Sequence, residues 1–272
     1  MRLAVLTDIH GNLAALEAVL ENIASQHVDH IVVAGDTVNI LPDSRACWNL
    51  VTGLENCTVL RGNHERYLFD YGTSQADPAW TTERFAGLGW TLQQFTREDL
   101  DVMRSLPLTY RLPELLVCHA APDNDQVNIV ADTPLSEIKT IFAQTSEAVL
   151  VRGHNHKWLE RHWSAHTLVS MASTGLPLNG NTNAQYLLLE QKPDGWYWQK
   201  QFVPYDVNLT LRRFDTSGYT EEGGALVPLF SEEVRTAHSL LLPFLWQYLE
   251  PVEAGELSLR DAVTRFLKEA KA

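Results

Sequence analysis

The chain has 272 residues, 45% of them hydrophobic, and carries 21 Lys and Arg against 34 Asp and Glu, for a formal net charge of −13. A chain of this length buries roughly three quarters of its unfolded surface and fits one large α/β domain, or one domain with an appendage; a second independent core is not expected. The acidic balance disfavours non-specific nucleic acid binding through a basic surface.

Cysteine content and hydropathy indicate the compartment. Cys47, Cys57 and Cys118 are an odd number, which is typical of reduced thiols in a cytosolic protein. No run approaches the ~20 apolar residues of a membrane span. The first predicted strand begins at residue 2, without an export signal before it. We therefore expect a cytoplasmic protein that does not enter a membrane.

Short apolar runs rich in Val, Leu and Ile, bounded by Gly, predict buried strands in the first part of the chain. They cover residues 3–7, 31–34, 59–61, 115–118 and 148–152. Apolar residues at helical spacing over residues 13–25 predict a helix between the first two strands, and so a strand-helix-strand unit. Later strands are expected over residues 168–173, 186–190 and 197–203, the last two joined as a hairpin.

The segment between the third and fourth predicted strands, residues 65–106, is too long for a simple connection and is rich in aromatic residues. It predicts a helical insertion beside the active cleft. Its aromatic side chains, Tyr71 and Trp80 among them, form the packing face of the insertion or line a pocket for a nucleobase or aryl leaving group.

The C-terminal part predicts helices. Ser231-Glu232-Glu233 is a helix-start signal that precedes an apolar helix to about residue 248, and a second helix is expected over residues 258–271. Leu241, Leu245 and Trp246 are expected to pack onto the parent domain. The alternative is a homodimer through these C-terminal helices.

Side chains that can bind metals follow each of the first five predicted strands. In open α/β sheets, residues just beyond the strand ends meet in one crevice. Imidazole, carboxylate and amide ligands without a thiolate suit manganese, iron, zinc or nickel better than calcium. The pattern therefore predicts a hydrolytic site with two divalent transition-metal ions. The side chains are Asp8, His10, Asp36, Asn63, His64, His119, His154 and His156.

Two cations held roughly 3.5–4 Å apart need an anion between them. Asp36 is the candidate bridging carboxylate and thereby a catalytic residue. Such metals lower the pKa of bound water to about 7, so a bridging hydroxide becomes available as the nucleophile for an in-line displacement at phosphorus.

Five sequence blocks carry a resemblance to a known family. They are Asp8-x-His10, Gly35-Asp36, Gly62-Asn63-His64-Glu65, His119 and Gly153-His154-Asn155-His156. In this order they resemble the five signature blocks of the calcineurin-like metallophosphoesterase superfamily, in its bacterial single-domain type, and residues 172–189 resemble the segment that follows them.

The resemblance implies an α/β fold: a four-layer α-β-β-α sandwich of two mixed sheets, with the helical insertion and a C-terminal helical appendage. The metallophosphoesterase domain would cover residues 1–210, with the insertion at about 65–106, and the appendage would cover residues 211–272.

The resemblance also implies a role for each block residue. His64 would face the leaving-group oxygen and protonate it, which is general-acid catalysis of about 10²- to 10⁴-fold. The first metal would be bound by Asp8, His10, Asp36 and His156, and the second by Asp36, Asn63, His119 and His154.

The sequence departs from Ser/Thr protein phosphatases after Gly35-Asp36, where it lacks their acidic and arginine residues. Asn39 stands in place of the carboxylate that pairs with the leaving-group histidine in those enzymes, so His64 is expected to be held less strongly. Asn39, Arg61 and Arg66 are candidate substrate-binding residues. Arginines beside such motifs clamp phosphate or pair with carboxylates.

These features together predict a phosphoester hydrolase that acts on a small-molecule phosphodiester or nucleotide-type substrate. The alternatives are a phosphomonoesterase or protein phosphatase, and a non-catalytic scaffold on the same fold.

Overall fold

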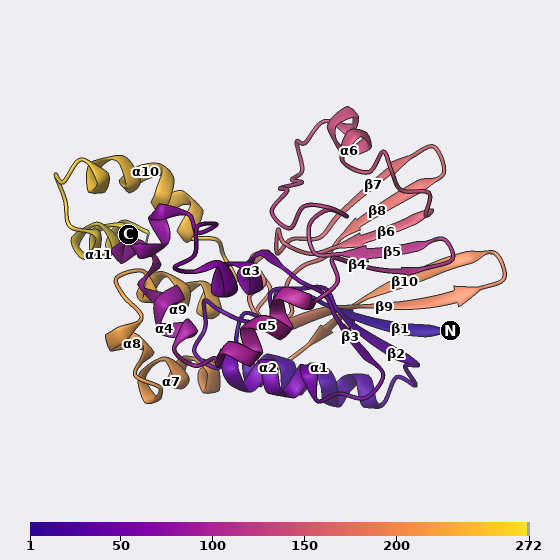
Figure 1. Ribbon diagram of the computed structural model, residues 1–272, viewed down its shortest axis with the longest axis horizontal. Coiled ribbons are helices and arrows are strands. Elements are labelled where there is room, and N and C mark those ends of the chain that lie inside the picture. Colours follow the sequence, from indigo (N-terminus) through magenta and orange to yellow (C-terminus); the bar gives the residue numbers. More distant parts are fainter. Residues whose placement is uncertain (271–272) are drawn as a thin grey trace.

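The computed structural model describes residues 1–270, whose strands form two five-stranded sheets (Figure 1). The first sheet contains, in spatial order, β10 (Gly195–Val203), β9 (Ala184–Lys192), β1 (Arg2–Leu6), β2 (His30–Val33) and β3 (Cys57–Val59). The second contains β4 (Thr109–Leu112), β5 (Leu115–Cys118), β6 (Val149–Arg152), β8 (His166–Ser170) and β7 (Leu159–Trp163). Both sheets are mixed, because the parallel central strands have antiparallel neighbours, β9 beside β1 and β7 beside β8.

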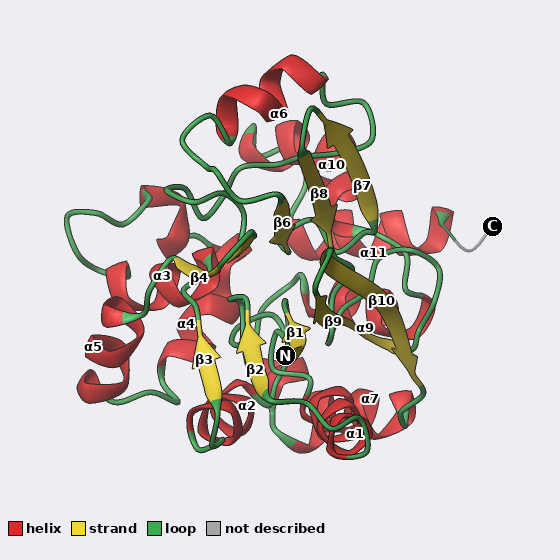
Figure 2. Ribbon diagram, turned by 90° about the vertical axis from the view of Figure 1, so that its right-hand side faces the viewer, coloured by secondary structure: helices red, strands yellow, loops and turns green. Residues whose placement is uncertain are grey.

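Alternating side chains of the central strands create the layers. In β1, Leu3 and Val5 pack into the core between the sheets, whereas Ala4 and Leu6 pack against α1 (Leu13–Ala24) and α2 (Ser44–Thr52). In β5, alternate residues likewise face the inner core and α6 (Leu135–Ile141). Figure 2 shows α1 and α2 below one sheet and α6 above the other. The predicted α-β-β-α sandwich is confirmed.

The insertion after β3 is helical, as the sequence predicts. It contains α3 (Asn63–Asp70), the 3-10 turns η1 (Pro78–Thr81) and η2 (Glu83–Phe85), α4 (Ala86–Leu92) and α5 (Arg97–Ser105). Trp80 is buried in the small core of this insertion and packs on Tyr67, with ring centroids 4.8 Å apart. Trp80 thus contributes to packing within the insertion.

The C-terminal helices are α7 (Val207–Thr216), α8 (Tyr219–Glu222), α9 (Val227–Thr236), α10 (Leu241–Glu253) and α11 (Leu259–Glu269). The expected single helix from Ser231 to about residue 248 is wrong. Ser231 lies inside α9, and Ala237 ends that helix in a left-handed conformation with φ 53°. The Glu233 carboxylate then accepts the N–H groups of Leu240 and Leu241 at 2.7 and 2.9 Å, which starts α10. A side chain inside one helix thus caps the next, and no local motif signals this.

Other expectations need smaller corrections. The third strand ends at Val59 instead of residue 61, and β4 and β7 had no counterpart among the predicted strands. The proposed boundary at residue 210 between the domain and its appendage stays a prediction; residue 210 lies within α7. Cys47, Cys57 and Cys118 are all free thiols.

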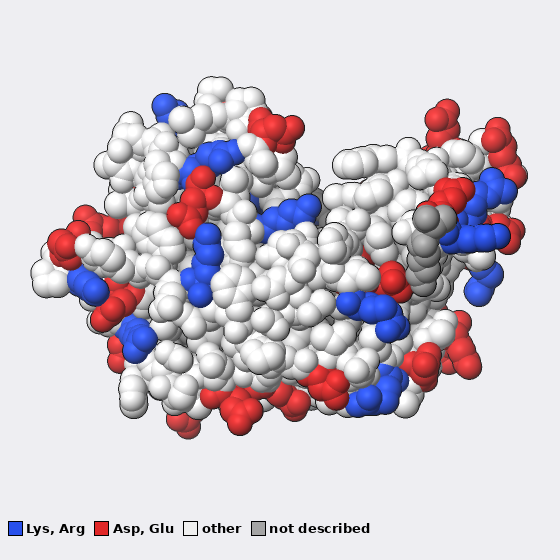
Figure 3. Space-filling view, turned by 180° about the vertical axis from the view of Figure 1, so that it is seen from behind, with Lys and Arg blue, Asp and Glu red and all other residues white. Residues whose placement is uncertain are grey.

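No helix within residues 1–270 is both long enough and apolar enough to cross a bilayer. On the face drawn in Figure 3, basic side chains are interspersed with acidic ones instead of gathered in one patch. The same view shows the surface hollowed between the lobe of the sheets and the lobe of the C-terminal helices.

Candidate metal centre

The loops that follow β1, β2, β3, β5 and β6 meet at one end of the sandwich, and the buried Asp36 lies at their centre. Asp36 Oδ2 lies 3.3 Å from His119 Nε2, 3.8 Å from His10 Nε2 and 3.9 Å from His64 Nε2. Asp36 is therefore placed where a bridging carboxylate would have to lie.

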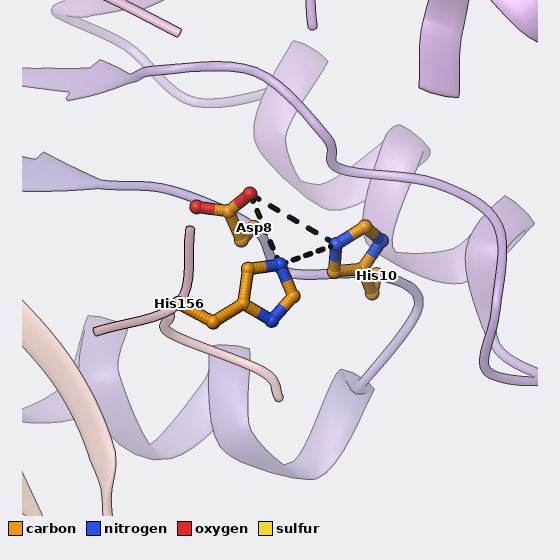
Figure 4. A group of neighbouring side chains, drawn as sticks. All are labelled: Asp8, His10 and His156. Carbon is orange, nitrogen blue, oxygen red and sulfur yellow. Dashed lines mark hydrogen bonds and ion pairs between the residues drawn. The ribbon is translucent and has the colours of Figure 1, made fainter. Parts of the chain in front are cut away.

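A first group of ligand atoms lies on one side of Asp36. Asp8, His10 and His156 point toward one another (Figure 4). The two Nε2 atoms of His10 and His156 are 3.0 Å apart, and His156 Nε2 is 3.3 Å from Asp8 Oδ1. Ligand atoms of these three residues lie within 4.8 Å of one another, which is close enough to share one ion.

A second group lies on the other side. Asp36, His119 and His154 also place their ligand atoms within 4.8 Å of one another. Asn63 joins them, because its Oδ1 lies 3.0 Å from His119 Nε2 and 3.1 Å from His154 Nδ1. All seven expected ligands thus lie around Asp36, and a further group, His10, Asp36 and His64, also places its ligand atoms within 4.8 Å of one another. The division of the ligands between two ions stays a prediction.

The loops reach this arrangement through unusual backbone conformations. Non-glycine residues with positive φ are uncommon and cluster at functional sites. The residues of this kind among the expected ligands are Asp8, His10, Asp36, His154 and His156. Glycines allow the close approach: a Cβ on Gly62 would lie 2.1 Å from Asp36 Oδ1, and one on Gly153 would lie 2.6 Å from Asp8 Oδ2.

Backbone carbonyls orient two of the imidazoles. His119 Nδ1 donates to the Ala34 carbonyl at 2.9 Å, and His156 Nδ1 donates to the Leu176 carbonyl at 2.7 Å. A ring whose Nδ1 carries the proton presents the lone pair of Nε2, which is the usual second-sphere arrangement for a metal-binding histidine. In both residues Nε2 faces the site, beside the carboxylate of Asp36 or of Asp8.

These contacts fit divalent cations. Asp8 Oδ1 is buried and has no hydrogen-bond partner within residues 1–270, and the Nε2 atoms of His10 and His156 face each other at 3.0 Å. Buried polar atoms are almost always satisfied, and a cation bound by these carboxylate and imidazole groups would satisfy Asp8 Oδ1. The mixed nitrogen and oxygen donor set suits a transition metal.

The electrostatics of the site support this fit. Burial raises the pKa of Asp8 and Asp36. The neighbouring histidines, His156 beside Asp8 and His119 beside Asp36, lower these pKa values by more than burial raises them, so both carboxylates have a pKa well below the ordinary value. Burial lowers the pKa of His119, but the negative charge of Asp36 has the larger opposite effect, so the pKa of His119 is raised to about 9. The two carboxylates therefore stay ionised and attract cations.

His64 lies at the edge of both groups, at the start of α3. Its Nδ1 accepts from the Asn39 amide at 2.8 Å, and Asn39 Oδ1 accepts in turn from the Thr91 hydroxyl at 3.3 Å. Nδ1 is then the acceptor nitrogen, and the proton of the neutral ring is on Nε2. Burial lowers the pKa of His64, and Asp36 partly offsets this.

Sequence reasoning assigned no role to Glu65, whose carboxylate holds the backbone of the loops that carry the ligands. This fully buried carboxylate accepts the N–H groups of Asp36, Thr37 and Gly62 at 2.9, 2.7 and 2.8 Å. Burial and the charge of Asp36 raise its pKa to about 7. Its position directly after His64 in the motif was the available signal.

The candidate substrate-binding arginines, Arg61 and Arg66, and the nearby Arg152 each contact other groups of the protein, and a role for the two candidates in binding substrate stays a prediction. Arg66 pairs with Asp125 through two hydrogen bonds of 2.8 Å. Arg61 places its guanidinium 5.7 Å from the centre of the Phe69 ring. Arg152 is fully buried, where it donates to backbone carbonyls and to Asn155.

Comparison with known proteins agrees with this geometry. A family model described as calcineurin-like phosphoesterase matches residues 1–194. An uncharacterised protein of Methanocaldococcus jannaschii is 26% identical over 207 residues, which cover 70% of this chain and 83% of that protein.

Two solved structures share the fold. A metallophosphoesterase from Sphaerobacter thermophilus aligns with a TM-score of 0.70 at 23% identity, over 87% of this chain and 99% of that one. A hypothetical protein from Pyrococcus horikoshii OT3 aligns with a TM-score of 0.71 at 19% identity, over 88% of this chain and 99% of that one. With the family model matching most of the chain, we conclude that the protein belongs to the calcineurin-like phosphoesterase family and is a phosphoester hydrolase.

Proposed function

We propose that the protein hydrolyses a small-molecule phosphodiester or nucleotide-type ester with two divalent metal ions, and that His64 is the general acid. The observation that carries this proposal is the convergence of two ligand groups on Asp36, with His64 Nε2 only 3.9 Å from the shared carboxylate. Asp8, His10, Asp36 and His156 would bind one ion, and Asp36, Asn63, His119 and His154 the other.

The residues divide the work. When bound, the two ions would lower the pKa of water toward neutrality and offset the negative charge of the phosphoryl oxygens. Asp36 lies between the two ligand groups, and its negative charge would offset the repulsion between the two bound ions. Asn39 orients His64 through the 2.8 Å contact between its amide group and Nδ1, so that Nε2 faces the site. As the general acid, His64 would act in its protonated form, the imidazolium, and would donate the Nε2 proton to the leaving-group oxygen.

The roles of Asp36 and His64 can be separated by mutation. We expect His64→Ala to retain its metal and lose about 10²- to 10⁴-fold in kcat, since the lost step is proton donation. Asp36→Asn should lose metal as well as turnover. Metal content by elemental analysis, measured beside kcat, makes the distinction; wild-type turnover in His64→Ala would contradict the assigned role.

The substrate class is tested with one grid of assays. The protein is stripped with chelator and reloaded separately with manganese, zinc, nickel or iron. Hydrolysis of an aryl monoester, an aryl diester and a dinucleoside polyphosphate is then compared. Preference for the monoester under every metal would favour the alternative of a phosphomonoesterase.

A homodimer through the C-terminal helices remains a proposal. Leu241 and Leu245 pack in the core of the C-terminal helices, whereas Leu242 and Trp246 on α10 are 51% and 82% exposed. We expect Trp246→Ser to weaken self-association in sedimentation velocity experiments, because it removes the largest exposed apolar side chain of this helix. A wild-type protein that stays monomeric over a wide concentration range would contradict the dimer.

A further inference from the structure

A cavity of about 360 Å³ opens beside His64, between the helical insertion and the C-terminal helices. Asn39 and His64 form its end toward the metal centre, and Leu241 and Leu245 of α10 contribute to the wall from the C-terminal helices. Small-molecule sites usually measure about 300–1,000 Å³. The cavity therefore has room for one ring system and is too small for a folded partner.

The chemistry of the lining selects a ring. Four aromatic side chains face the cavity: Tyr67, Phe85, Tyr219 and Phe230. Aliphatic side chains supply most of the remainder. Aromatic and apolar walls with a few polar groups are typical of sites that bind flat organic ligands.

The charge of the lining favours an uncharged group over a second phosphate group. Arg84 is the one Lys or Arg among the lining residues, and its guanidinium lies 3.7 Å from the Glu253 carboxylate. A polyphosphate leaving group would need several unpaired cations. An uncharged leaving group needs none, so this wall suits a neutral alcohol.

Tyr219 offers a polar contact to such a ligand. Its hydroxyl is buried and has no hydrogen-bond partner within residues 1–270. A Cβ on Gly87 would lie 2.6 Å from that hydroxyl, and one on Gly223 would lie 2.3 Å from the ring, so two glycines that line the cavity leave space for this tyrosine. Buried tyrosine hydroxyls usually find a partner, and here a ligand can supply it.

We infer that this cavity binds the leaving group of the ester, and that this group is an uncharged alcohol with an aromatic ring. The orientation rests on the proposed function, in which His64 faces the leaving oxygen. Hydrolysis uses one water: a P–O bond to the water oxygen forms and the P–O bond to the alcohol breaks. The alcohol oxygen takes the Nε2 proton of the His64 imidazolium, the proton of the attacking water passes to solvent, and His64 is then reprotonated from solvent. The ring can come from an aryl alcohol or from a nucleoside.

The test measures binding of the free alcohol, so that it does not depend on hydrolysis. Chelator-treated protein is dialysed to equilibrium against 2-naphthol or adenosine. Leu245→Trp should fill the cavity and weaken binding by at least about tenfold, since a hydrophobic pocket discriminates by ~10- to 200-fold per misfitting group. Leu242→Trp is the matched control, because Leu242 lies on the same helix but is 51% exposed and does not line the cavity.

Two further variants keep the outcome decisive. Leu241→Trp narrows the same cavity from another position on α10, and thermal melting shows whether each variant is folded. Tyr219→Phe removes only the hydroxyl and should weaken adenosine, which carries hydrogen-bond acceptors, by several-fold.

Binding of 2-naphthol alone assigns an aryl source, and binding of adenosine alone assigns a nucleoside; binding of both supports the aromatic ring as the shared feature. The inference is overturned if neither alcohol binds, or if the folded Leu245→Trp and Leu241→Trp variants bind as the wild type does. Failure of the proposed function would appear differently, as absence of hydrolysis by the metal-loaded protein while the alcohols still bind.

Discussion

At the scale of residues, the site depends on side chains that hold other groups in place. His119 and His156 are oriented by backbone carbonyls, His64 by the Asn39 amide, and the loop that carries Asp36 by Glu65. Each of these contacts determines which atom faces the metal centre. Replacing a supporting residue should therefore damage the site without removing any ligand atom.

Glu65 provides the sharpest case. Its removal in Glu65→Ala leaves three buried N–H groups without acceptors, those of Asp36, Thr37 and Gly62. Each unpaired buried donor costs about 1–3 kcal/mol, so we expect the free energy of unfolding to fall by about 3 kcal/mol or more. Urea unfolding measures it. Glu65→Gln retains one acceptor oxygen and should lose less; equal stability of Glu65→Ala and wild type would refute the supporting role.

At the scale of elements, the C-terminal helices matter because α10 contributes to the wall of the cavity beside His64. The start of α10 depends on Glu233 in α9, whose buried carboxylate accepts the N–H groups of Leu240 and Leu241. A charged group is thus buried to join two short helices. Its burial has a cost that depends on pH.

Burial raises the pKa of Glu233 above its ordinary value of 4.5, and the two backbone N–H groups and His156 only partly oppose this. A carboxyl with a raised pKa in the folded state stabilises the fold below its unfolded pKa, and that contribution is lost as the pH rises through the folded pKa. Glu233→Gln keeps an acceptor oxygen but carries no charge. Relative to wild type, it should therefore gain stability as the pH rises from about 4.5 to 8.

Urea unfolding of chelator-treated wild type and Glu233→Gln across this pH range measures the difference in their free energies of unfolding. Because both proteins contain the histidines of the metal centre, the titration of those histidines affects both alike. Curves that run parallel at all pH values would show that the Glu233 carboxylate does not control stability.

At the scale of the whole molecule, the metal centre ties together segments that are distant in the chain. His10 and His156 are 146 residues apart in sequence, yet their Nε2 atoms are 3.0 Å apart. Five loops from two sheets share the site. Metal bound there links both sheets in the folded state and finds no such arrangement in the unfolded chain.

We therefore expect removal of metal to lower the melting temperature of the whole protein. Metal at a thousandfold excess over its Kd stabilises the folded state by about 4 kcal/mol, and ~1 kcal/mol corresponds to about 2–4 °C in a chain of this size. Differential scanning calorimetry with and without chelator should show a fall of about 10 °C. In Asp36→Asn the two scans should nearly coincide; the same coincidence in wild type would argue against a resident metal.

What the sequence by itself determined is the position of most strands along the chain and the identity of the side chains at their ends, because these follow from local periodicity and from short motifs. The sandwich was implied by the resemblance of those motifs to a known family. Asp8, Asp36 and His119 each follow a short apolar run that the sequence predicts as a strand, and these runs form β1, β2 and β5.

Only the tertiary structure decided how those residues meet. It decided the left-handed backbone that aims the ligands, the three donors that converge on Glu65, and the break between α9 and α10. It also brought Tyr219, Leu245 and His64 to the walls of one cavity, which lies between the helical insertion and the C-terminal helices. The contacts of Glu65 with Asp36 and Thr37 and the walls of the cavity have no periodic signature, since they join segments far apart in the chain.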